Sequence, residues 1–427
     1  MKRMCLFVVS CIFIIAACAT NNQTNDQTNN QISVKVIDGR GNGIANATVV
    51  VGNQIGEVTS FLSTDDFGEA YFDVASPNAT VTAAFSCYDP SANKTYYYVD
   101  IAYGVNVSAV TLTLGTCDRN TQQININVTD EVAGITNREV TLGPITYSGS
   151  SVTMYVYELQ DDGNISVFAS GYDDADNIKG YGFALDQPAV DGSVIEIAID
   201  RTDLVQYTHL FGSIPLSTVS YYAFAALLRK HASTNLPFNF IWGTAPLPAS
   251  MTTYSSDSFA DTNMFGATVS VDQDSDGNTD ADIGLIRYLN DVSDQFFDFS
   301  LAPLVPGNIT FDPGATGRPI IEWSNNDPSS TMQILVLSHN SDSPQKASFY
   351  YTMTVPASAE DLVFPELPNE LAAFRPGAYS NLSLETVKFD KPASYDDYLE
   401  ASVNYNGRFY EEEALSSYSY TRISRLP

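Results

Sequence analysis

Oxygen-bearing side chains with the spacing of a calcium-binding loop occupy one short segment of the sequence. Asp stands at positions one, three, five and nine of this segment, Gly at position six and Asn at position seven. In such loops alternate side chains point inward, the glycine makes a sharp turn, and residue seven supplies its backbone carbonyl. The predicted calcium ligands are Asp272, Asp274, Asp276, Asn278 and Asp280.

The same segment departs from the calcium-loop pattern at position twelve. That position normally carries a bidentate carboxylate but is Ile283 here, and Asp282 lies one residue earlier. The segment resembles the loops of dockerin-like and thrombospondin type 3-like repeats, which have the carboxylate that is missing. Because Asp and Gly also favour solvated turns, a hairpin turn without a metal is the alternative. The strands expected on either side are Thr268–Val271 and Ile283–Tyr288.

Catalytic motifs are absent from the sequence. It contains no GxSxG, no HExxH, no Walker loop and no GxGxxG after a strand. Its three histidines, His209, His231 and His339, are far apart. A pair of carboxylates that cleaves a glycosidic bond is still possible, because the distance between two carboxylates depends on the fold and cannot be read from the sequence. We therefore expect a non-enzymatic protein, with a hydrolase whose site lies in 121–303 as the alternative.

The beginning of the chain has the features of an export signal. Basic residues 2–3 precede an apolar run, Cys5–Ile15, that is too short to span a bilayer as a helix. The following Ala16-Ala17-Cys18 resembles the lipobox of bacterial lipoproteins. The resemblance implies that residues 1–17 are a removed signal peptide and that Cys18 carries lipid, which would anchor the protein to a membrane.

An ordinary signal peptide, cleaved near Ala17 or Ala19, is the alternative to lipidation. If the lipoprotein resemblance holds, Ala19 after the cysteine implies transfer to the outer membrane, or simply to the cell surface in a host with one membrane. Residues 18–31 are almost entirely Ala, Asn, Gln and Thr. They cannot build a core, so we expect a flexible spacer.

The remaining cysteines fit an exported protein. Cys5 and Cys11 would leave with the signal, and Cys18 would carry lipid, so Cys87 and Cys117 are left as one pair. A pair in an exported chain predicts a disulfide, and two buried free thiols are the alternative.

The composition favours strands joined by polar turns. The chain has 427 residues, of which 25 are Tyr and 23 Phe, and Asp outnumbers Glu among its 50 acidic residues. Aromatic residues favour strands, whereas Asp is typical of turns. The sequence therefore predicts an all-β fold of tandem Ig-like β-sandwich domains. The net charge of −30 argues against nucleic acid as a partner, because phosphate backbones need basic surfaces.

Residues 32–117 form the first expected domain. Strand-type alternation begins at Ile32–Asp38, and Gly43 and Gly68 stand where tight turns are needed. With Phe72 as a core residue, the pattern resembles carboxypeptidase regulatory-like and bacterial Ig-like domains. The resemblance implies a β-sandwich and brings no peptidase site with it.

Two further β-rich segments follow, 121–303 and 304–427. The first is one large domain or two small sandwiches, and Val219–Lys230 within it fits either a helix or a buried strand. The second resembles fibronectin type III-like modules, because a strand ending in Trp, Pro319–Trp323, precedes an alternating strand. A short helix is expected at Pro368–Phe374.

Three aromatic residues of the last segment have two interpretations. Trp323, Tyr350 and Tyr351 are expected in the core of a sandwich, with a platform that stacks against sugars as the alternative. The sequence as a whole predicts a lipoprotein of the outer membrane or cell surface that binds a protein or glycan, or acts as a scaffold. The alternatives are the lipid-anchored hydrolase and a glycan-binding lipoprotein of a polysaccharide-uptake system.

Overall fold

The structure is a computed structural model that describes most of the chain. The described residues are 31–39, 41–73, 78–90, 92–117, 122–142, 145–156, 164–175, 177–203, 205–228, 235–244, 248–255, 262–276, 279–289, 295–312, 318–324, 327–341, 346–375, 379–404 and 417–425. Cys18, the expected signal peptide, the spacer up to residue 30 and Asn278 lie outside these ranges.

Strands dominate the described residues, and the all-β prediction is confirmed. The helical segments among them are short: η1 (Phe299–Leu301), η2 (Asn369–Phe374) and α2 (Tyr395–Asn404). In this part of the chain, no helix has the length and apolar character that crossing a membrane requires.

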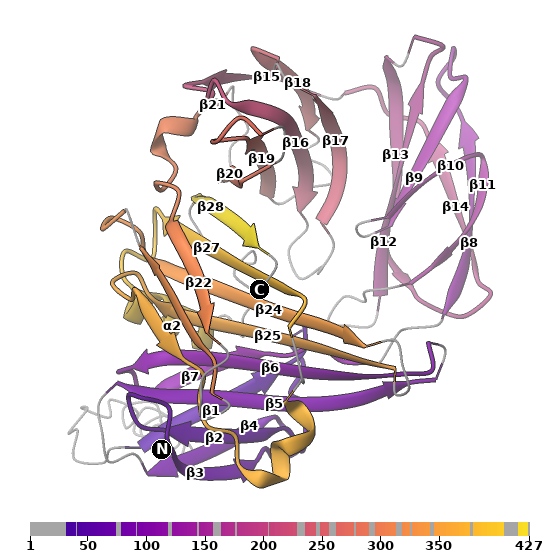
Figure 1. The fold of residues 1–427 in the computed structure, drawn as a ribbon. Coiled ribbons are helices and arrows are strands. Elements are labelled where there is room, and N and C mark those ends of the chain that lie inside the picture. Colours follow the sequence, from indigo (N-terminus) through magenta and orange to yellow (C-terminus); the bar gives the residue numbers. More distant parts are fainter. Residues whose placement is uncertain are drawn as a thin grey trace, which may run out of the picture.

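A central twelve-stranded sheet runs through the described part of the molecule (Figure 1). Its strands, in order, are β17 (Asn235–Thr244), β16 (Thr218–Leu228), β19 (Thr262–Val271), β20 (Ala281–Leu289), β28 (Tyr418–Arg425), β27 (Asn381–Phe389), β24 (Met332–Ser341), β25 (Ala347–Pro356), β6 (Lys94–Val105), β5 (Ala79–Asp89), β2 (Thr48–Gly52) and β3 (Val58–Ser63). Strands from the beginning, middle and end of the chain therefore form one sheet.

Both faces of the central sheet contribute to hydrophobic cores, because successive side chains of a strand point to opposite sides. Along β6, Ile101 and Tyr103 belong to one hydrophobic core, and Ala102 and Val105 belong to another. We call the face that carries Ile101 the inner face and the face that carries Ala102 the outer face.

The β1 sheet and helix α2 cover part of the outer face. This sheet consists of β4 (Glu69–Asp73), β1 (Gln31–Ile37) and β7 (Ala109–Thr113). Val34 and Phe72 share a core with Val49 of the central sheet, and Tyr395 and Leu399 bring α2 into the same core. The first expected domain thus packs as a sandwich of which one layer belongs to the central sheet.

Two small sheets cover the inner face. The β15 sheet consists of β18 (Ser250–Ser255), β15 (Val205–Gly212) and β21 (Gln295–Asp298); the β23 sheet consists of β22 (Gly307–Asp312), β23 (Ile320–Ser324) and β26 (Asp361–Val363). One continuous core unites them with the central sheet, from Phe211 and Phe265 to Trp323 and Leu335.

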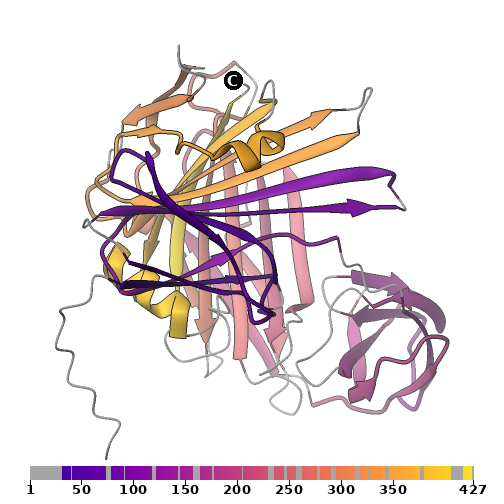
Figure 2. The same cartoon turned by 90° about the horizontal axis from the view of Figure 1, so that it is seen from below.

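Residues 122–203 form a second sandwich beside the rest of the molecule (Figure 2). One layer is β11 (Ser151–Tyr155), β8 (Gln123–Asp130) and β14 (Val194–Ile199); the other is β10 (Ile145–Ser148), β9 (Asn137–Leu142), β12 (Asn164–Tyr172) and β13 (Ile178–Pro188). Ile126, Val140 and Ile197 lie in its own core. Strand β9 contacts β17 of the central sheet.

Several local expectations can be compared with these elements. Residues 219–228 of the ambiguous segment Val219–Lys230 lie in strand β16, and residues 229–230 lie outside the described ranges. The short helix expected at Pro368–Phe374 is the 3-10 helix η2. Both turn glycines are required by their surroundings. A Cβ atom on Gly43 would lie 2.0 Å from the carbonyl oxygen of Phe67, and Gly68 has a φ of +78°.

Candidate functional site

The acidic segment forms a loop between β19 and β20, as the sequence predicts, and three of its aspartates converge. Carboxylate oxygens of Asp272, Asp274 and Asp276 lie within 4.8 Å of one another. Asp272 is buried, whereas Asp274 and Asp276 are exposed. Hydrogen bonds from backbone N–H groups to these carboxylates stabilise the loop: Ser275 N–H donates to Asp272 Oδ1 at 2.6 Å, and Asp276 N–H donates to Asp274 Oδ1 at 3.1 Å. Carboxylate oxygens are the ligands that calcium prefers, so the three side chains fit that ion.

The other predicted ligands are placed differently. Asp280 does not join the cluster; its Oδ2 accepts hydrogen bonds from the N–H groups of Gln273 at 2.6 Å and Asp274 at 3.2 Å. This bonding closes the loop, which is the ordinary role of Asp in turns. Asn278 lies outside the described residues.

A row of polar side chains crosses the outer face next to the acidic loop. The row has one residue on each of four neighbouring strands, each opposite the next: Ser270 on β19, Asp282 on β20, Arg422 on β28 and Glu385 on β27. Ser270 Oγ donates to Asp282 Oδ1 at 2.7 Å, and Arg422 Nε donates to Glu385 Oε2 at 2.8 Å. Burial lowers the pKa of Arg422, but Glu385, together with Tyr420 and Asp282, outweighs this effect, and the net shift is upward.

The next row along these strands is aromatic. Tyr420 is opposite Gly284, and a Cβ atom on that glycine would lie 2.2 Å from Tyr420 Cε1. The ring therefore fills the space above residue 284. Oη of Tyr420 is 2.9 Å from Oγ1 of Thr268, and the two hydroxyls share a hydrogen bond. Tyr222 of β16 lies opposite Thr268 and is 44% exposed.

Sequence reasoning missed this pair of rows. The alternation of Tyr418, Tyr420 and Arg422 indicates a strand that presents these side chains to one face. It does not reveal that Gly284, far away in the sequence, lies under the Tyr420 ring.

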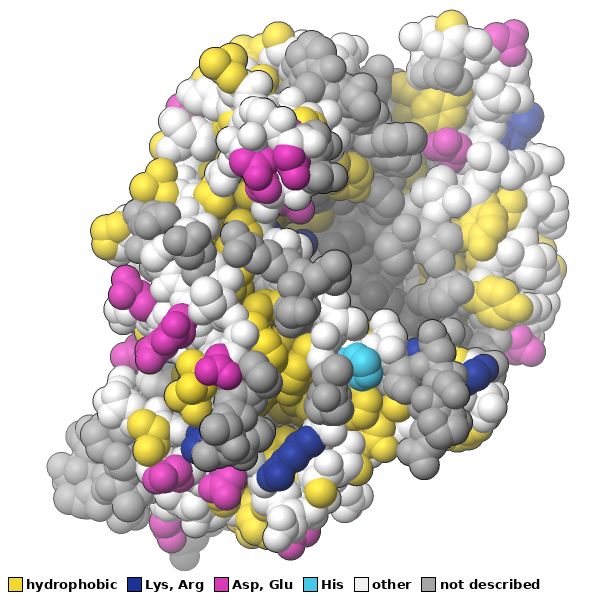
Figure 3. All heavy atoms as spheres, viewed as in Figure 1, with side chains coloured by type: hydrophobic (Ala, Val, Ile, Leu, Met, Phe, Trp, Pro, Cys, Tyr) yellow, Lys and Arg dark blue, Asp and Glu magenta, His cyan; other side chains and the backbone are white. Residues whose placement is uncertain are grey.

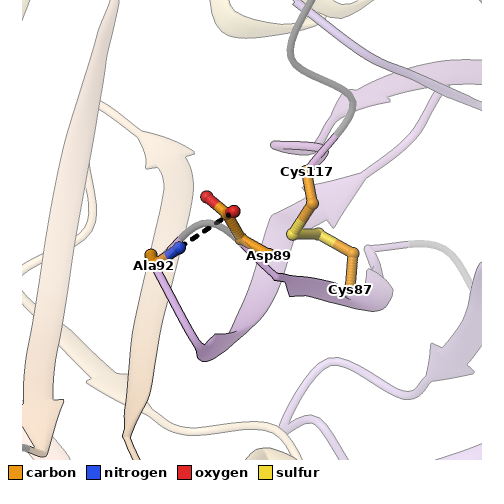
Figure 4. The surroundings of a disulfide bond; sticks show 4 residues. All are labelled: Cys87, Asp89, Ala92 and Cys117. Atoms are coloured by element: carbon orange, nitrogen blue, oxygen red, sulfur yellow. Dashed lines mark hydrogen bonds between the residues drawn. A yellow bond between two sulfur atoms is a disulfide. The ribbon is translucent and has the colours of Figure 1, made fainter.

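The structure joins Cys87 to Cys117 in a disulfide, with Cα atoms 5.6 Å apart (Figure 4). Cys87 lies on β5, and Cys117 follows β7 just before the chain continues toward the 122–203 sandwich. On the same hairpin, Ala92 N–H donates to Asp89 Oδ1 at 3.2 Å. The disulfide therefore attaches the end of the first sandwich to the central sheet.

The three aromatic residues of the last segment divide between core and surface. Trp323 and Tyr351 are buried in the inner core, as expected for sandwich residues. Tyr350 is 37% exposed, and its ring lies near those of Tyr96 and Tyr98, with centroids 6.4 and 5.5 Å away.

Asp100 has the perturbed pKa that a catalytic carboxyl can have, but it is placed as a core residue. Burial raises its pKa to about 7, against the lowering effect of hydrogen bonds from the backbone N–H groups of Thr113 and Ile101. The Thr113 N–H lies 2.8 Å from Oδ2. Only 9% of the residue is exposed, beneath β7 and α2, so a substrate could not reach the carboxyl without moving these elements.

The charged surface reflects the composition. On the face seen in Figure 3, acidic side chains are scattered and basic ones are fewer, in keeping with 50 acidic against 20 basic residues. Binding of an extended polyanion needs clustered basic side chains.

Comparison with known proteins gives no assignment. No family model matches the chain, and no curated protein matches it. The Bacillus anthracis TIE protein is 8% identical over 63% of this chain with a TM-score of 0.17, and the match spans 49% of that protein, about half its length. A DUF4876 family protein from Bacteroides thetaiotaomicron is 9% identical over 70% of this chain and 74% of its own, with a TM-score of 0.16. Neither likeness supports an argument about function.

Proposed function

We propose that this protein is a lipid-anchored protein of the outer membrane or cell surface whose β-rich body binds a ligand or acts as a scaffold. One observation carries the proposal: the basic start, the short apolar run and the Ala-Ala-Cys18 boundary stand directly before a polar spacer. Strand β1 begins at Gln31, where that spacer ends. The arrangement suits a folded body held away from a membrane surface.

A binding role suits the body better than catalysis does. The carboxyl of Asp100 is buried inside a core, whereas Tyr222 and Arg422, one from each row of the outer face, are exposed to solvent. Calcium belongs to the same proposal, with Asp272, Asp274 and Asp276 as its carboxylate ligands. Their mutual repulsion would be relieved by a divalent cation, which would tighten the hairpin between β19 and β20.

Lipidation is tested by replacing Cys18 with serine in the full chain. The wild type should partition into the detergent phase and increase in mass by the attached acyl chains. Cys18→Ser should remain as an unprocessed precursor or appear in the aqueous phase. A Cys11→Ser variant is the matched control, because Cys11 belongs to the expected signal and should not alter the mature product. If Cys18→Ser enters detergent fully at normal mature size, the anchor is not at this residue.

A further inference from the structure

Two aromatic residues stand in one line across the outer face of the central sheet. Register places Tyr222 opposite Thr268, and Thr268 opposite Gly284, which the Tyr420 ring covers. Residue 222 and residue 284 are therefore two strand spacings apart, about 9.5 Å. Two pyranose units of an extended sugar chain repeat over nearly this distance, so both rings could contact one oligosaccharide.

The neighbouring polar row is fixed in position before any ligand arrives. Asp282 is bonded to Ser270, and Glu385 is bonded to Arg422, whose Cζ lies 5.6 Å from the Tyr420 ring centroid. A guanidinium has five N–H donors and a carboxylate about four acceptor sites. The hydrogen bonds among these described residues use only some of those donors and acceptors, and 45% of the Arg422 side chain is exposed. The row can therefore donate to and accept from further hydroxyl groups.

We propose that these two rows form a binding site for a neutral oligosaccharide, laid across β16, β19, β20 and β28. The C–H groups of a pyranose face carry slight positive charge and pack against the negative face of an aromatic ring, as on Tyr222 and Tyr420. Sugar hydroxyls make strong hydrogen bonds with charged planar groups such as those of Asp282, Arg422 and Glu385.

The charge balance selects a neutral sugar over an acidic one. The row combines one guanidinium with two carboxylates, and the whole chain has a net charge of −30, which repels polyanions. This inference rests on the proposed binding function and names its ligand class.

The test measures retention of the full chain, purified in detergent, during native electrophoresis through gels that contain neutral polysaccharides. The gels hold hydroxyethyl cellulose, xylan, glucomannan or laminarin, and polygalacturonate is the acidic comparison. Calorimetry with the matching hexaoses then gives affinities. We expect at least one neutral glycan to bind. Tyr222→Ala and Tyr420→Ala should each weaken that binding about five- to tenfold, as the loss of a stacked aromatic contact implies.

Two further variants separate stacking from general disturbance of the sheet. Tyr420→Phe keeps the ring and should bind within about twofold of the wild type. Tyr350→Ala removes a tyrosine that is 37% exposed elsewhere on the central sheet and should bind normally. Because Tyr222 is more exposed than Tyr420, Tyr222→Ala remains informative even if Tyr420→Ala fails to fold.

Three results would overturn the inference. Retention by none of the neutral glycans, or by polygalacturonate alone, would exclude the ligand class. Normal affinity of a folded Tyr222→Ala variant would exclude the site. The detergent partition of wild type and Cys18→Ser is scored separately, so failure of glycan binding with normal lipidation would refute the ligand and leave the anchored protein intact.

Discussion

Replacing Asp100 with asparagine should remove much of the pH dependence of this protein's stability. The Asp100 carboxyl is buried between β6, β7 and α2, and its pKa in the folded state is about 7 against 3.8 for the free side chain. A folded-state pKa above the unfolded value means that the folded protein binds the proton more tightly. The stabilisation is thus fully present below pH 4 and is lost as the pH rises to about 7.

The size of the effect follows from the shift. A rise of the Asp100 pKa from 3.8 to about 7 corresponds to about 4 kcal/mol, so the free energy of unfolding falls by about this amount between pH 4 and pH 8. The ionisable groups facing Asp100 from α2 are Tyr395 and Tyr398, whose pKa values are raised, mainly by burial, so they stay neutral over this range.

Urea unfolding of wild type and Asp100→Asn at pH 4 and pH 8 measures this quantity. The amide still accepts the Thr113 N–H, and the cost of burying its own N–H groups is the same at both pH values. The stability of the variant relative to wild type should therefore rise by about 4 kcal/mol from pH 4 to pH 8. Tryptophan fluorescence is a suitable readout, because Trp242 and Trp323 lie on β17 and β23 and not in the 122–203 sandwich.

The control is Asp66→Asn, at an exposed aspartate in the turn before β4. It shows how much of the change comes from removing one charge from a chain of net charge −30. If the difference between Asp100→Asn and wild type is the same at both pH values, the carboxyl is not desolvated as the structure places it, and the reasoning is refuted.

Two other predictions concern the acidic loop and the disulfide. Calcium should raise the unfolding midpoint of the full chain relative to chelator, because at one hundred times its dissociation constant it adds about 2.7 kcal/mol to the free energy of unfolding. Asp274→Ala or Asp276→Ala should abolish this shift. If the wild type unfolds at the same midpoint with calcium and with chelator, the segment is a solvated turn without a metal. If the shift survives both substitutions, calcium binds elsewhere in the chain. Replacing Cys87 and Cys117 together by serine should cost about 3–4 kcal/mol, because the bond closes a long loop in the unfolded chain. Peptide mapping without reductant that finds both thiols free would contradict the pairing.

Local patterns predicted the strands because side-chain alternation is a local property. The expected strand Ile283–Tyr288 lies within β20, and Ile32–Asp38 overlaps β1. The segment Val219–Lys230 could not be resolved locally, since its Ala and Leu residues favour a helix while its tyrosines favour a strand. Tertiary pairing of β16 with β17 and β19 decides between them.

The predicted calcium ligands show where spacing alone is insufficient. The carboxylates of Asp272, Asp274 and Asp276 converge, as the spacing predicts. The spacing also included Asp280, but its carboxylate instead accepts hydrogen bonds from backbone N–H groups of the loop. Spacing specifies which side chains can point inward in an ideal loop. It does not specify which of them the backbone uses to satisfy its own donors, and that choice depends on the coordinates of the whole turn.

Strand partners explain why the physical layers differ from the sequence segments. Strand β25 pairs in parallel with β6, and β28 pairs with β20, so segment 304–427 supplies neighbours to both earlier segments. Without this segment, β6 and β20 would each lose a neighbouring strand, and the rest of the inner core would be exposed to solvent. Unpaired strand edges promote aggregation. The same pairing builds the proposed sugar site, since Gly284 comes from segment 121–303 and Tyr420 from the end of the chain. Neither segment alone carries the ring over the glycine, so the surface exists only when the central sheet is complete.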